Sequence, residues 1–288
     1  MIYLHENGVT VVAQTGAKGA KAGETYELNG DKYYVAIDRF DLRRLIEEGA
    51  DMSKVVTSKI TTMNHLFYNS SFNQDISSWD TSRVKSMSNM FMWNEVFNQP
   101  IGNWNTKNVT AMMSMFEGAI SFNQPIGEWD TCRLYNISNM FENAKSFNQP
   151  IENWDVSQVA HMLSTFKGAI SFNQSLSKWN FGAVAPRMFS LFEGAKSFNG
   201  NLRGWKLNGS LTSLFKGAES FNQPLDSWDV SNVDSMKSLF EGAKSFNQDI
   251  SKWDTSSLYS TENMFYGASS FNQDIGIWNV GCVTNMKN

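Results

Sequence analysis

A repeat of about 25 residues constrains this chain more than any other feature of its sequence. Phe-Asn recurs nine times, with Phe at positions 72, 97, 122, 147, 172, 198, 221, 246 and 271, so the intervals are 25, 25, 25, 25, 26, 23, 25 and 25 residues. A Trp follows each of these Phe residues seven positions later, at 79, 104, 129, 154, 179, 205, 228, 253 and 278. A fixed period in this range is typical of stacked coils, in which each unit buries its apolar face against its neighbours. The repeat therefore predicts an α/β tandem-repeat solenoid of nine coils.

The most regular unit predicts three local conformations within each coil. It runs from residue 221 to 245 and reads FNQPLDSWDVSNVDSMKSLFEGAKS. The pattern Val-x-x-Met-x-x-Leu-Phe-x-x-Ala has spacings of three and four, which predict a short helical turn, and Gly242 is expected to end it with a positive φ. Pro224 makes a fully paired central strand improbable in Phe-Asn-Gln-Pro-Leu, so a very short parallel strand is expected around Ser-x-Val-x-x-Met instead. Each coil should then contain a short strand, a helical turn and an extended return.

The Asn of every Phe-Asn pair is expected to form a structural ladder along the stack. Its side-chain amide can hydrogen-bond the loop backbone of its own coil and of the next one; direct ligand binding by these residues is the alternative. The polar residue after each Trp, such as Asp80 or Asn105, is expected to cap the following turn. A ladder of calcium sites is disfavoured, because each unit offers only one carboxylate or amide there and the glycine-rich Asp pattern of calcium-binding β-rolls is absent. The nine residues of the expected ladder are Asn73, Asn98, Asn123, Asn148, Asn173, Asn199, Asn222, Asn247 and Asn272.

The repeat closely resembles that of the BspA-like leucine-rich-repeat surface proteins. The pattern Phe-Asn-Gln-x-Ile/Leu-x-x-Trp-Asp-x-Ser-x-Val-x-x-Met-x-x-Met/Leu-Phe-x-x-Ala is similar above all to a repeat of roughly 25 residues first noted in Mycoplasma lipoproteins of unknown function and found widely in bacteria. The resemblance covers about Val55 to Asn288. It implies a leucine-rich-repeat-like solenoid, placement at the cell surface or in the secreted fraction, and roles in adhesion or in binding host proteins.

The two ends and one internal region depart from the repeat. Residues 1–54 are expected to form a small α+β N-terminal cap, with a β-hairpin at 25–36 that turns at Asn29-Gly30 and a helix at 40–49; a separate functional domain is the alternative. Residues 55–288 form the repeat region, whose C-terminal unit is incomplete. The Trp-to-Phe spacing is 13 residues from Trp179 to Phe192 and 10 from Trp205 to Phe215, against 12 elsewhere. The region is therefore irregular at about 180–215, which we attribute to neutral drift, with a bend or a pocket as alternatives.

The sequence offers no residues that we assign to catalysis, to a cofactor or to a metal. His5, His65 and His161 lie far from Cys132 and Cys282 in the sequence, and no phosphate-binding or hydrolase motif occurs. The recurring carboxylates of Glu117, Glu142, Glu193 and Glu241 are expected to form a solvated face rather than an acid–base pair. A net charge of −4, from 24 basic and 28 acidic residues, gives no electrostatic basis for binding nucleic acid. A non-enzymatic protein without a cofactor is expected.

Nothing in the sequence indicates insertion into a membrane. The N-terminus lacks the charged and apolar regions of a secretory signal, and no apolar run reaches the ~18 residues that a spanning helix needs. The location therefore stays open between the surface or secreted placement that the resemblance implies and the cytoplasm.

The nine Trp residues in register allow two interpretations. The Ile or Leu residues beside them and the total apolar area favour a place in the core. An exposed aromatic stripe would instead provide a carbohydrate-binding surface, although a stripe of this length would promote aggregation.

A binding face should lie where side chains differ from coil to coil, and they vary most just after the Val of each unit. These positions lie on or beside the predicted strand, which lines one continuous face. We expect a protein partner of unknown identity to be recognised there. Adhesion is the leading functional hypothesis, and an intracellular scaffold or inhibitor and a carbohydrate-binding module are its alternatives. The candidate contacts are Lys85, Thr110, Tyr135, His161, Asp234 and Tyr259.

Overall fold

The N-terminal region contains both helices and most of the strands of the protein that the structure describes. The structure is a computed structural model and describes residues 1–16, 19–183 and 185–287. The elements before the repeats are β1 (Ile2–Leu4), β2 (Val11–Ala13), β3 (Thr25–Leu28), β4 (Asp31–Val35), helix α1 (Arg39–Glu47) and the 3₁₀ helix η1 (Met52–Lys54). Strand β5 (Val55–Val56) follows, and β6 (Gly209–Ser210) and β7 (Val233–Ser235) lie within the repeats.

The local sequence accounts for the shapes of these N-terminal elements. Strands β3 and β4 pair antiparallel around Asn29 and Gly30, whose φ angles of 54° and 86° suit a tight hairpin turn. Asp38 caps α1 by accepting hydrogen bonds from the N–H groups of Phe40 and Asp41. Strand β5 then pairs parallel with β4, so the small sheet passes directly into the first coil.

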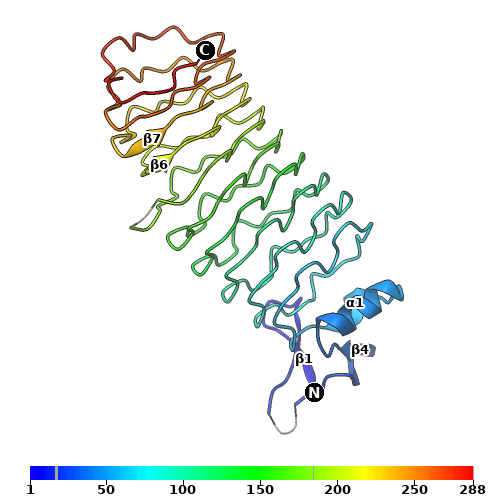
Figure 1. Cartoon of the computed structure of the whole chain (residues 1–288). Coiled ribbons are helices and arrows are strands. Elements are labelled where there is room, and N and C mark those ends of the chain that lie inside the picture. The colour runs from blue at the N-terminus through cyan, green and yellow to red at the C-terminus, as the bar shows by residue number, and fades with distance from the viewer. Residues whose placement is uncertain (17–18, 184, 288) are drawn as a thin grey trace.

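The repeats stack side by side into an elongated body. Figure 1 shows successive turns of chain, from cyan to red, lying next to one another, with the N-terminal elements at one end of the stack and the C-terminus at the other. The repeat architecture is therefore present in the structure. The strands are shorter than expected: most coils pair through a single parallel bridge, as between Ala111 and Asn136. Among the described coils only β6 and β7 pair as strands, and their register shifts between Gly209 and Ser210.

The prediction of a helical turn in each coil is wrong. In a representative coil, Ser114 and Gly118 have φ angles of 53° and 68°, and the corresponding residues of other coils are also left-handed, so no α-helix can form. Alternate N–H groups point instead at the next coil, where carbonyls lie in register. The bonds join Met112 to Asn136, Ser114 to Ser138, Phe116 to Met140 and Gly118 to Glu142, at 3.0, 2.9, 2.9 and 2.7 Å.

The Asn residues of the Phe-Asn pairs are linked by hydrogen bonds along the stack. The Oδ1 of Asn148 accepts a bond of 2.9 Å from the backbone N–H of Asn173 and one of 2.8 Å from Nε2 of Gln174. Equivalent backbone bonds of 2.7–3.0 Å join all nine Asn residues in sequence order. The side chain thus provides an acceptor for an extended return segment that has no strand partner.

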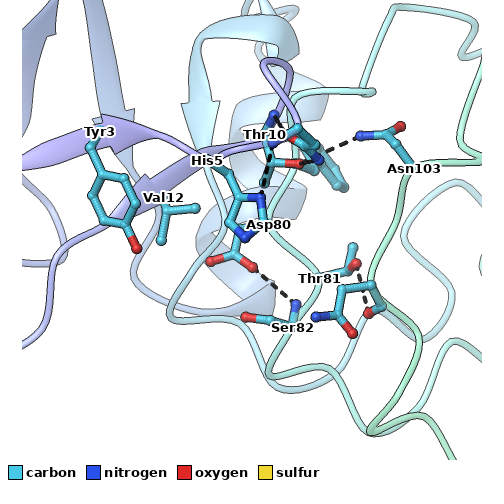
Figure 2. Close-up of a pocket in the computed structure, with 11 residues that line it drawn as sticks. Tyr3, His5, Thr10, Val12, Asp80, Thr81, Ser82 and Asn103 are labelled. Atoms are coloured by element: carbon cyan, nitrogen blue, oxygen red, sulfur yellow. Dashed lines mark hydrogen bonds between the residues drawn. The ribbon is translucent and has the colours of Figure 1, made fainter. Parts of the chain in front are cut away.

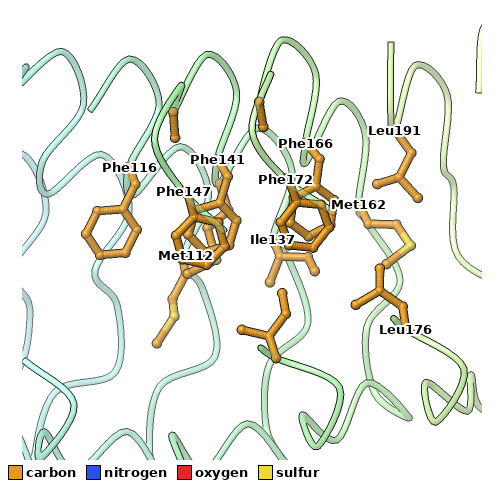
Figure 3. Close-up of a cluster of buried hydrophobic side chains, with 14 of the residues drawn as sticks. Met112, Phe116, Ile137, Phe141, Phe147, Met162, Phe166, Phe172, Leu176 and Leu191 are labelled. Atoms are coloured by element: carbon orange, nitrogen blue, oxygen red, sulfur yellow. The ribbon is translucent and has the colours of Figure 1, made fainter. Parts of the chain in front are cut away.

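Phe rings form continuous rows inside the stack, and Trp rings stack beside them in shorter runs. Figure 3 shows the Phe rings of neighbouring coils, among them Phe116, Phe141 and Phe166, following one another through the core. The rings of Trp104 and Trp129 are stacked with centroids 6.5 Å apart. Eight of the nine repeat Trp side chains are at most 6% exposed, and Trp278 in the last coil is partly buried. Each indole N–H donates to a backbone carbonyl of an earlier coil, as Trp129 does to Ile101 at 3.1 Å. The Trp residues therefore line the core.

Candidate functional site

The variable positions form a row on one side of the stack, joined through their backbones. The N–H of Thr110 donates to Lys85 at 2.9 Å, and that of Tyr135 donates to Thr110 at the same distance. The row continues through Ala160 to Arg187. Because the backbone groups are bonded within the stack, the side chains are the parts of this row that remain available for contacts. We call the row from Lys85 to Tyr259 the variable face.

The side chains of the candidate contacts are mostly open to solvent. Lys85, Thr110 and Asp234 are exposed, and His161 is half-buried. Tyr135 is 54% exposed, and its ring meets that of His161 edge-on with centroids 5.3 Å apart. The structure therefore brings these two residues into contact and leaves one side of the Tyr135 ring accessible.

A pocket of about 460 Å³ opens on this face at the irregular unit. Asp234 and Tyr259 line it together with Pro186, Arg187 and Phe189. The parallel bridges run without a break from Thr62 to Arg187 and resume at β6, but none between Arg187 and β6 occurs in the described part of the chain. The pocket lies where the two rows of bridges fail to meet. Lys85, Thr110, Tyr135 and His161 lie farther along the face and do not line this pocket.

The irregular spacing changes the surface, whereas the Phe rows of the core continue through it. Trp179 and Trp205 still stack at 6.2 Å and Phe192 and Phe215 at 5.8 Å across the irregular unit. Phe181 is 3% exposed and packs edge-on against Trp205, with centroids 5.1 Å apart. The extra residue before the pocket and the shortened unit after it are therefore accommodated in the loops of the variable face. Position 184, within the region predicted to be irregular, lies outside the described residues.

Most residues that line the pocket were not among the candidates from the sequence, and two of these, Arg187 and Phe189, have exposed side chains suited to binding. Arg187 is exposed, and Phe189 is 39% exposed although it is a large apolar residue. Among the described residues, neither Arg187 nor Asp234 has an ion-pair partner. The sequence signal for this site was the change in repeat spacing together with Pro186.

The burial of the repeat Trp residues contradicts one functional alternative, a carbohydrate-binding surface made of exposed Trp rings. A carbohydrate surface made of exposed repeat Trp residues requires accessible ring faces, whereas these rings stack on one another inside the protein. That version of the carbohydrate hypothesis is wrong. Trp93, which lies outside the register, is 38% exposed, and its ring lies against Gly118.

Neighbouring groups and burial shift the pKa values of two side chains in the repeats, Glu117 and Cys132. Burial raises the pKa of Glu117, and the nearby charge of Glu142 adds to this rise. The thiol of Cys132 is exposed, but a hydrogen bond to Asp130 raises its pKa, so the thiolate is disfavoured. In the described part of the chain, no three His, Cys, Asp or Glu side chains are placed to hold a metal ion together.

No helix that the structure describes is long and apolar enough to cross a membrane.

Comparison with known protein families gives matches over almost the whole repeat region. The family described as "Mycoplasma protein of unknown function, DUF285" matches residues 40–145, 124–210 and 208–288. No curated protein and no solved structure gives a match. Three matches that together run from residue 40 to residue 288 establish the assignment, and they agree with the tandem repeats seen in the structure. The chain belongs to the DUF285 family of Mycoplasma-type repeat proteins.

Proposed function

We propose that this protein is a non-enzymatic solenoid of the leucine-rich-repeat-like, BspA-like type that binds a protein partner through its variable face. The pocket between Arg187 and Tyr259 is the proposed anchor point. Adhesion is the biological role that we propose for it, and a scaffold or inhibitor inside the cell would use the same face.

The observation that carries the proposal is the composition of the pocket. Arg187 and Asp234 are charged residues without ion pairs among the described residues, and they flank the exposed aromatic rings of Phe189 and Tyr259. Arg and aromatic residues dominate the energetics of protein interfaces, because they bring large contact areas and directional hydrogen bonds. A partner segment with an apolar side chain between an acidic and a basic residue would match this arrangement.

The backbone of the pocket supports a role for its side chains in binding. The N–H of Tyr259 donates to Asp234 at 2.9 Å, and its carbonyl accepts the N–H of Thr284 at 2.9 Å. The stack therefore retains these bonds when the phenol ring is removed. A side chain that is 51% exposed and not required for stacking can change without loss of the fold.

Random-peptide display on the whole chain tests the proposal. Peptides selected on the wild-type protein are expected to contain an aromatic or aliphatic residue near an acidic and a basic residue. Binding of a selected peptide, measured by fluorescence anisotropy, should weaken by about 30-fold in Tyr259→Ala and in Arg187→Ala, which is the size of an interface hot spot of about 2 kcal/mol.

Tyr266→Ala is the matched control, because Tyr266 is 63% exposed and does not line the pocket. It should leave peptide binding unchanged. Failure to select any peptide, or equal binding by all three variants, would count against the variable face as the site of recognition.

A further inference from the structure

Another pocket lies at the N-terminal end of the repeats, under the hairpin formed by β1 and β2. Hydrogen bonds attach the hairpin to the first coils, among them those from the N–H of Val11 to the carbonyl of Ser78 at 2.9 Å and from the N–H of Ala13 to Oγ of Ser58 at 2.8 Å. Between them they leave a pocket of about 240 Å³. Figure 2 shows His5 and Thr10 of the hairpin region opposite Asp80 and Asn103 of the coils.

Asp80 is the most unusual group in this pocket. Asp80 occupies the position after the repeat Trp and is only 6% exposed. At the same position in other coils, the aspartates are exposed: Asp130, Asp155, Asp229 and Asp254. One carboxylate oxygen of Asp80 accepts the N–H of Ser82 at 3.0 Å, and no described residue forms an ion pair with it. A buried carboxylate with so few partners favours hydrogen-bond donors from a ligand.

The neighbouring polar groups supply both donors and acceptors. Nδ2 of Asn103 donates to the carbonyl of Ser77 at 2.8 Å and to Oγ1 of Thr10 at 3.5 Å, and no described residue donates to its side-chain oxygen. Oδ1 of Asn105 accepts the N–H of Lys107 at 3.2 Å, and no described residue accepts a hydrogen bond from its Nδ2.

His5 adds a donor on the hairpin side. Its Nδ1 lies 3.4 Å from the N–H of Asn7 as an acceptor, so Nε2 carries the proton in the neutral ring. The ring of Tyr3, 46% exposed, adds an aromatic surface to the lining.

We propose that this pocket binds a single hexose-sized sugar ring. Hydroxyl groups both donate and accept, so they match a lining in which a carboxylate and an amide oxygen stand beside an amide N–H and an imidazole N–H. The volume suits one small ring rather than a larger ligand, and Tyr3 offers a surface for the C–H face of the ring. The site is separate from the variable face and does not depend on the function proposed for it.

Titration of the full chain with glucose, galactose, mannose and N-acetylglucosamine, followed by saturation-transfer NMR, tests this proposal. At least one sugar should bind saturably, and Asp80→Asn should weaken its binding by at least about tenfold, because an amide cannot accept hydrogen bonds at both of its terminal atoms. Asp80→Asn should not disturb folding, because Asn105, Asn180 and Asn279 occupy the same position in other coils.

Asp130→Asn is the control for the general effect of this substitution. It makes the same change in a coil that the hairpin does not cover, so sugar binding should remain as in the wild type. Absence of saturable binding by all four sugars would overturn the proposal, as would equal binding by Asp80→Asn and the wild type. Binding of tetramethylammonium with no binding of the neutral sugars would also overturn it and would show a cation site instead.

Discussion

At the scale of single residues, side chains form the hydrogen bonds that the backbone of the return loops would otherwise make with a neighbouring strand. The Asn ladder is one example, and the residue after each Trp is another: Oδ1 of Asp229 accepts the N–H of Ser231 at 3.0 Å. A third row was not expected from the sequence, in which Thr106 donates through Oγ1 to the carbonyl of Asp130 in the next coil at 2.9 Å. The same polar side chains recur at fixed positions of each unit and therefore provide hydrogen-bond partners for the backbone of every coil.

The Asn ladder predicts a difference between two neighbouring positions. Asn148 accepts two hydrogen bonds from the next coil, whereas Asn173 accepts only one, from the N–H of Asn199 at 2.7 Å, because Gly200 replaces the usual Gln. We expect Asn148→Ala to cost about 1–3 kcal/mol in the free energy of unfolding, and Asn173→Ala to cost less. Urea denaturation of the two variants checks this order, and equal losses would contradict it.

The raised pKa of Glu117 predicts a pH-dependent effect on stability. Burial favours its protonated form in the folded protein, so stability is lost as the pH rises from the unfolded pKa through the higher folded pKa. Glu117→Gln should remove this loss and raise the melting temperature at neutral pH, but not at pH 3. The gain should stay below about 1 kcal/mol, because solvent screens a partly exposed group.

Glu219→Gln provides the control of opposite sign. The hydrogen bonds from Lys244 and Lys196 lower the pKa of Glu219, so its ionised form stabilises the folded protein above the unfolded pKa, and this contribution is lost as the pH falls. Its replacement should lower the melting temperature at neutral pH. A rise in both variants would refute the assignment of the two environments.

At the scale of elements, the left-handed turn replaces the helix that the spacing of apolar residues predicts. Spacings of three and four do bring Val, Met, Leu and Phe to one side, as they would in a helix. Alternate N–H groups that a helix would use internally are instead bonded to the next coil, as from Phe116 to Met140 at 2.9 Å. The spacing of apolar residues within one unit cannot distinguish a helix from the left-handed turn, because the hydrogen-bond acceptors belong to the next unit.

The turn containing Gly118 predicts a coupling between two residues. Gly118 has a φ of 68°, and a Cβ added there would collide with the ring of Trp93, whereas Gly242 faces only the backbone of Gly217 at 3.6 Å. Gly118→Ala should therefore destabilise the protein more than Gly242→Ala, by about 1–3 kcal/mol. Thermal unfolding of the double variant Trp93→Gly with Gly118→Ala should show a smaller additional loss, and strict additivity would argue against the contact.

At the scale of the whole molecule, stability comes from rows of rings that cross every coil. The repeats contact mainly their neighbours, so a lesion in a central coil separates the stack into two parts. The spacing of the irregular unit varies, yet Trp179 still stacks on Trp205 and Phe192 on Phe215, and a pocket opens on the surface there.

Burial of the Trp rows predicts the fluorescence of the protein. Emission should be blue-shifted and poorly quenched by acrylamide, because the repeat Trp residues up to Trp253 are at most 6% exposed. Trp93→Phe should remove a large part of the quenchable signal, since Trp93 is 38% exposed. Trp129→Ala should cost about 3–5 kcal/mol, which urea denaturation would measure. Red-shifted and readily quenched emission from the wild type would contradict the packing.

The sequence by itself determined the repeat, the residues of the core and the row of Asn side chains that links the coils. These follow from chemistry that recurs at every period: apolar residues must be buried, and return loops need polar partners. It also indicated the hairpin that turns at Asn29 and Gly30, because that conformation depends on adjacent residues.

Only the tertiary structure decided the backbone of the turns and the location of both pockets. The choice between a helix and an inter-coil ladder depends on acceptors about 24 residues away, as with Phe116 and Met140. Asp80 becomes a buried carboxylate because β1 and β2 fold back over its coil, and Arg187 and Tyr259 come to line one pocket at the irregular unit. Both pockets lie where one coil differs from the others in its spacing or in the segment that covers it. Contacts between distant segments then determine which side chains are exposed.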